Sequence, residues 1–119
     1  MSAATGSSSG LTLPLSAAVR KAYEDLYASV ETAIEGTADG ALLETLNDVH
    51  DGIGAVISAD NRYRLEQNTV LFEALLKQVN DVNCALKKLQ DQIASIAKGM
   101  ERLGEVAAGI EKVMGMVPL

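Results

Sequence analysis

An apolar heptad stripe in the second half of the chain places the strongest constraint on what it can fold into. With Leu65 at heptad position a, fifteen of the sixteen a and d positions up to Val117 are apolar, and only Asn68 is polar. A stripe that keeps one phase for seven heptads is typical of a coiled coil or of a long bundle helix. Read as one helix, residues 62–114 would extend roughly 80 Å at about 1.5 Å per residue.

Two shorter amphipathic helices are expected before the stripe. Apolar residues recur at spacings of three and four over Leu15–Ala33 and again over Leu42–Val56, which is the helical period. The first helix is expected to end at Gly36, and Asp39 is a residue type that caps the start of the second. The two glycines within residues 52–54 predict a kink or a close helix contact.

The composition fits one helical domain. The chain has 119 residues, of which 48% are hydrophobic and 3% aromatic, and its two prolines lie at positions 14 and 118. A proline-free interior favours long helices, the first of which is expected to begin near Pro14. Residues 1–12 are expected to form a flexible Ser/Gly-rich tail and residues 13–119 a single helical-bundle or coiled-coil domain. The predicted fold class is all-α, an elongated helical bundle with a short N-terminal helical hairpin and a long heptad-repeat C-terminal helix.

The length of the stripe predicts that copies of the chain associate. Two helices of about 20 residues are roughly 30 Å long and would shield less than half of it. Each apolar side chain left in water would forgo about 1.5–3 kcal/mol of burial energy, and a second copy is the simplest partner. We therefore expect a homo-oligomer, with a dimer as the first expectation. The expected interface residues are Leu75, Val79, Val82, Leu86, Leu89, Ile93, Ile96, Met100, Leu103 and Ile110.

Two asparagine-containing stretches leave alternatives open. A lone amide in an apolar seam can specify register, which is the role expected for Asn68, although this residue could equally mark a frayed start of the seam. A break at Asn80–Asn83, with Asn80 or Asp81 as the new cap, would instead give a self-contained four-helix bundle that can be monomeric. The heptad phase crosses this point unchanged, and that favours the long helix.

No motif indicates catalysis, a metal or a cofactor. The only histidine, His50, has Asp48 and Asp51 as neighbours, but residues one or two apart do not share a helix face, so no metal site is expected. The only cysteine, Cys84, falls on a heptad f position and is expected to be exposed. No GxxxxGK[ST] or GxGxxG phosphate-binding motif occurs. We expect a non-enzymatic protein without cofactors.

The charge distribution limits the classes of partner. The net charge is −6, and residues 1–61 hold two basic against nine acidic residues. No basic stripe is available to replace the counterions of a nucleic acid, so nucleic-acid binding is not expected. In the last segment Lys98, Arg102 and Lys112 alternate with three glutamates, so binding to anionic lipid is not favoured.

The expected function is a self-associating interaction or scaffold module in the cytoplasm. No stretch approaches the roughly 18 apolar residues of a membrane span, and no positively charged n-region precedes an apolar run. A protein exported without a cleaved leader, or a bacterial-type secretion chaperone, is the alternative, because Met1–Gly10 is rich in serine and glycine. A second alternative is a membrane-surface activity of the C-terminal helix.

Overall fold

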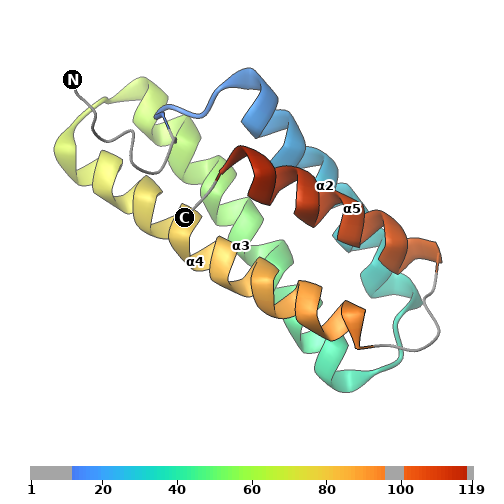
Figure 1. The fold of residues 1–119 in the computed structure, drawn as a ribbon. Helices are drawn as coiled ribbons and strands as arrows, with labels where there is room; N and C mark the ends of the chain where they lie inside the picture. The colour runs from blue at the N-terminus through green and yellow to red at the C-terminus, as the bar shows by residue number, and fades with distance from the viewer. Residues whose placement is uncertain (1–11, 96–100, 118–119) are drawn as a thin grey trace.

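The computed structural model describes residues 12–95 and 101–117, and these residues form an all-helical bundle (Figure 1). Four helices follow one another: α2 (Ala17–Gly36), α3 (Gly40–Leu65), α4 (Thr69–Ala94) and α5 (Glu101–Met116). Successive helices run in opposite directions along a common long axis (Figure 1). The predicted all-α bundle class is confirmed.

Local capping residues set the N-terminal hairpin much as the sequence predicts. Ser16 caps α2 by accepting the hydrogen bond of a backbone amide, so this helix begins three residues after Pro14. It ends at Gly36, as expected. Asp39 then caps α3, and its carboxylate accepts a hydrogen bond from the Leu42 amide at 3.0 Å. The second helix is longer than expected, at 26 residues, because it continues without a break through residues 58–61.

The prediction of one long helix over residues 62–114 is wrong. Residues 62–65 close α3, and the rest of the stripe is divided between α4 and α5. The longest dimension of the structure is 46 Å. The alternative break at Asn80–Asn83 is also wrong, because α4 runs through it. Its consequence, a four-helix bundle within one chain, is nevertheless what the structure shows.

The unbroken heptad phase misled the prediction for a physical reason. A heptad pattern records which face of a helix is apolar, and two helices that line one core can share a phase without being one helix. Leu89 of α4 and Leu103 of α5 both occupy d positions two heptads apart, and both are buried in the same core. Because α5 folds back, the chain covers its own apolar stripe. The expectation that a single chain is too short to cover this stripe is therefore wrong.

Two glycines permit close helix contacts in the bundle. A Cβ atom on Gly52 would lie 2.9 Å from a methyl carbon of Val82 on α4. One on Gly109 of α5 would lie 2.9 Å from a methyl carbon of Leu26 on α2. The close contact predicted near residues 52–54 is confirmed at Gly52. The α3–α4 and α2–α5 pairs pack most extensively, and among neighbouring helices α4 and α5 pack least against each other.

Candidate interaction surface

The residues predicted to form the oligomer interface lie mostly inside a single chain. Seven of them line the core: Leu75, Val79, Val82, Leu86, Leu89, Leu103 and Ile110. Ile93 is half-buried and packs against that core, whereas Ile96 and Met100 lie outside the described residues. Contacts of these residues between copies stay a prediction, and such contacts require the closed bundle to open.

Asn68 lies at the N-terminus of α4 and is exposed. Its side-chain oxygen accepts a hydrogen bond from the Leu71 amide at 2.9 Å, which is the geometry of an N-cap. Capping accounts for a polar residue at this heptad position within one chain. A register-specifying role in an assembly stays a prediction.

The turn between α3 and α4 is short and polar. The backbone leaves the helical region at Glu66, where the amide still donates to the Arg62 carbonyl at 3.0 Å. Arg62 and Arg64 occupy the last turn of α3, where cations are favoured by the partial negative charge of a helix C-terminus. The next helix starts immediately after Asn68. The two helices therefore meet in a tight corner at one end of the bundle.

The side chains around this corner are apolar and face solvent. Among the described residues, the large exposed hydrophobic side chains are Leu65 (84% exposed), Val70 (73%) and Phe72 (39%). We call these three residues the apolar tip. Phe72 makes an edge-to-face contact with Tyr63 across the turn, with ring centroids 5.9 Å apart. This aromatic pair joins the two helices and holds the tip in place.

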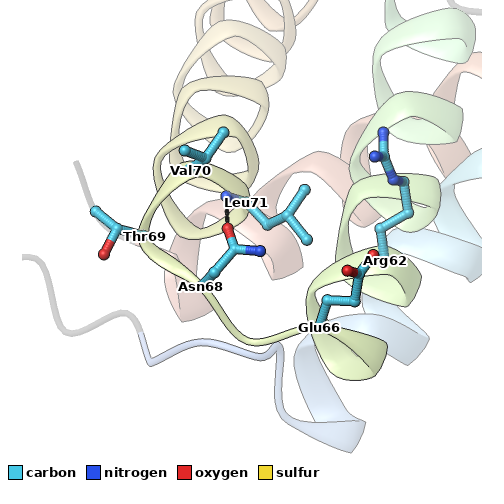
Figure 2. Close-up of a pocket in the computed structure, with 6 residues that line it drawn as sticks. All are labelled: Arg62, Glu66, Asn68, Thr69, Val70 and Leu71. Atoms are coloured by element: carbon cyan, nitrogen blue, oxygen red, sulfur yellow. Dashed lines mark hydrogen bonds between the residues drawn. The ribbon is translucent and has the colours of Figure 1, made fainter.

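Two open hollows adjoin the apolar tip. The first has a volume of about 370 Å³ and is lined by Arg62, Glu66 and residues 68–71. Figure 2 shows Leu71 extending from α4 toward α3, with Arg62 and Glu66 on α3 across the hollow. The second, of about 300 Å³, lies beside the Tyr63–Phe72 pair. Residues 68 and 69 line both hollows, so the tip combines projecting side chains with recesses.

A buried carboxylate lies on α3 five residues before Leu65 of the apolar tip, and it was not predicted from the sequence. Asp60 is fully buried and accepts hydrogen bonds from the Leu15 amide at 2.8 Å, Arg20 Nη1 at 2.9 Å and Arg64 Nε at 2.8 Å. This Asp60 cluster fastens the segment before α2 to the end of α3. The four-residue spacing of Asp60 and Arg64 is the signal that could have indicated an ion pair within a continuous helix.

A second buried polar cluster lies in the middle of the core. The Tyr23 hydroxyl donates to Asn83 Oδ1 at 3.1 Å, and Asn83 Nδ2 donates to the Val117 carbonyl at 3.3 Å. This Asn83 cluster joins α2, α4 and the end of α5. Burial raises the pKa of the Tyr23 hydroxyl above its ordinary value. The alternative of a break at Asn80–Asn83 would have placed Asn83 at a helix start, whereas it lies inside α4 and is buried.

The remaining residues singled out by the sequence do not join the tip. His50 is half-buried, stacks on Tyr27 with ring centroids 4.1 Å apart, and has Nε2 3.4 Å from a Glu31 oxygen. Cys84 is exposed, as predicted. Within residues 12–95 and 101–117, no three His, Cys, Asp or Glu side chains are grouped so that they could hold a metal ion. None of the described helices combines the length and the apolar character needed to cross a membrane.

The fold and the exposed surface together define a small helical bundle with one apolar corner. Comparison of the chain with protein-family models, with curated proteins and with solved structures finds no match. The surface of this chain is therefore the basis for assigning its function.

Proposed function

We propose that this protein is a non-enzymatic helical interaction module that self-associates, with the apolar tip as its working surface. The observation that carries the proposal is the position of Leu65, Val70 and Phe72, which are exposed together at one end of the bundle. The other large hydrophobic side chains of the described residues are buried or half-buried. Exposed apolar side chains gathered at one corner of an otherwise covered surface support an interaction site there.

The shape of the tip favours binding a surface over binding a small molecule. Pockets that enclose small ligands are concave and bury most of the ligand, whereas the two hollows here are open to solvent. General acid–base catalysis also requires an enclosed pair of titratable groups. Arg62 and Glu66 instead stand at the margin of an open recess. This arrangement supports a docking role.

Association through the heptad stripe is the second part of the proposal. Because those residues face the core, they meet a second copy only if α5 leaves its own bundle and packs into another. Exchange of a terminal helix preserves the contacts of the closed form, so its energetic cost is low. In such an exchange the extensive packing of α5 against α2 is lost in one bundle and formed again in the other. Exchange of α5 is slow because the bundle must open, whereas contact through the tip equilibrates quickly.

Sedimentation velocity over a concentration series tests the proposal. The double variant Leu65→Gln and Val70→Gln removes apolar area from exposed positions, so it should leave the fold intact and weaken association by at least about tenfold. A matched control is Ala28→Gln with Ala108→Gln, which adds the same residue at exposed positions on α2 and α5. Its association should equal that of the unaltered chain.

Two outcomes decide the matter. If the unaltered chain stays monomeric up to millimolar concentration, or if the tip variant and the control associate equally, the tip is not the working surface. After rapid dilution, a mass that falls slowly indicates exchange of α5, and a mass that falls at once indicates contact through the tip. Export without a leader, as a secreted protein or as a chaperone, depends on residues 1–10, which lie outside the described residues, and it stays a prediction tested by deleting them.

A further inference from the structure

The charges around the apolar tip point to the orientation in which two copies meet there. Arg62 in the last turn of α3 and Glu66 at its C-cap are four residues apart, are both exposed, and line the same hollow (Figure 2). The ion pairs formed by the described residues include neither of them. The tip therefore presents one cation, one anion and an apolar projection side by side.

The distribution of acidic residues favours the tip as the meeting point of two like-charged chains. Residues 31–51, which include the α2–α3 turn, hold six acidic residues and no lysine or arginine. That turn lies at the end of the bundle opposite the tip (Figure 1). Residues 60–72 hold two acidic and two basic residues. When two copies meet at their tips, their acidic ends are separated by most of the combined length of two 46 Å bundles. This separation is far greater than the screening distance of about 8 Å at physiological salt.

A two-fold axis satisfies these charges. In such an interface residue i of one copy faces residue j of the other, and the reverse contact forms at the same time. Resting on the proposed function, we propose that a second copy of this chain docks tip to tip, with Arg62 of each copy opposite Glu66 of the other. Leu65 and Val70 of each copy then enter the 370 Å³ hollow of its neighbour.

The size of the tip sets the strength of this dimer. Stable protein interfaces bury about 800 Å² on each partner, whereas the apolar tip consists of three side chains, of which Phe72 is only 39% exposed. The dimer therefore dissociates readily, with a dissociation constant weaker than about 1 μM. Such a contact responds to small changes in charge, and this makes the pairing testable.

Charge exchange between the two positions is the experiment. Arg62→Glu alone and Glu66→Arg alone each replace two attractive pairs with two repulsive ones and should weaken the dimer by about fivefold to tenfold. The double variant Arg62→Glu with Glu66→Arg should restore the original affinity, and an equimolar mixture of the two single variants should associate better than either alone. Lys87→Glu, on an exposed position near the opposite end of α4, is the matched control and should leave the tip dimer unchanged. Circular dichroism confirms that each variant is folded.

The outcomes separate this proposal from the proposed function. If neither the double variant nor the mixture recovers affinity while Leu65→Gln with Val70→Gln still weakens it, the tip associates but the Arg62–Glu66 pairing is overturned. If the tip variants have no effect on mass, both fail. Co-sedimentation of the unaltered chain with phosphatidylglycerol vesicles, together with a monomeric mass at every concentration, would assign the tip to a lipid surface and overturn the dimer.

Discussion

The two buried polar clusters differ in charge, but each holds one end of the described chain against a middle helix. The carboxylate of Asp60 is fully buried, and it is neutralised by Arg20 and Arg64, whose side chains are 23% and 40% exposed. Asn83 is a neutral amide that is 2% exposed and forms one hydrogen bond through each of its two polar atoms. A buried charge needs opposite charges nearby, whereas a buried amide needs only hydrogen bonds.

Each cluster attaches one end of the described chain to a middle helix. Asp60 on α3 accepts a hydrogen bond from the Leu15 amide, and Asn83 on α4 donates one to the Val117 carbonyl. Burial of apolar surface is non-directional and tolerates sliding of one helix along another. Hydrogen bonds to backbone atoms are directional, so the two clusters define where the first and last segments stop. Polar contacts thus specify position in a core whose stability is mainly apolar.

The largest effect is expected at the charged cluster. Asp60→Ala removes the acceptor of the Leu15 amide and the buried carboxylate that Arg20 and Arg64 share, and it should lower the free energy of unfolding by about 3 kcal/mol. This lies at the lower end for a broken buried ion pair because both arginines reach solvent. Urea unfolding followed by circular dichroism measures the loss. Asp60→Asn, which keeps an acceptor for the Leu15 amide but not the charge, should lose less, and equal losses would show that the Leu15 hydrogen bond contributes nothing beyond the arginine pairs.

A smaller effect is expected at the neutral cluster. Asn83→Ala leaves the Tyr23 hydroxyl and the Val117 carbonyl unpaired in the core, and it should cost about 2 kcal/mol by the same measurement. Asn80→Ala, at an exposed position one turn earlier on α4, is the control and should change stability by less than about 0.5 kcal/mol. If Asn83→Ala proves as costly as Asp60→Ala, charge is not what separates the two clusters.

The smallest effect at neutral pH, and a distinct pH dependence, are expected for Tyr23→Phe. Loss of one hydrogen bond should cost about 1 kcal/mol at pH 7. The folded protein holds the Tyr23 pKa above its unfolded value, so the stability gained from the protonated hydroxyl is complete below about pH 10 and is lost as pH rises further.

Chemical denaturation at pH 8 and pH 11 separates this contribution from the other titrating groups. The stability difference between the unaltered chain and Tyr23→Phe should shrink or reverse at the higher pH. A difference that stays constant between the two pH values would show that the hydroxyl is not held in its neutral form.

The N-terminal hairpin could be predicted from the sequence because its signals are local. Gly36 ends one helix and Asp39 caps the next through contacts within a few residues. The exposure of Cys84 follows from the same helical period that buries its neighbours Val82 and Leu86. Propensity, capping and periodicity act over one or two turns, and they can be read without knowing what the helix packs against.

The candidate site and the polar clusters could not be predicted in this way. Leu65 fits the apolar heptad as well as Leu75 does, yet one is 84% exposed and the other is fully buried, because a turn follows Leu65 and a neighbouring helix covers Leu75. Asn83 stands 34 residues from its Val117 partner and 60 from Tyr23. Such contacts depend on which helices pack together in the tertiary structure.

The sequence by itself determined that the chain is helical and which face of each helix is apolar, since both follow from the spacing of residues along a single helix. Only the tertiary structure decided which surface covers each apolar face. The last helix, α5, packs against α2, and in this arrangement one chain buries a stripe that a straight helix would have to share with another molecule. Burial energy depends on the area removed from water and not on which chain covers it, so the heptad pattern is equally satisfied by either arrangement.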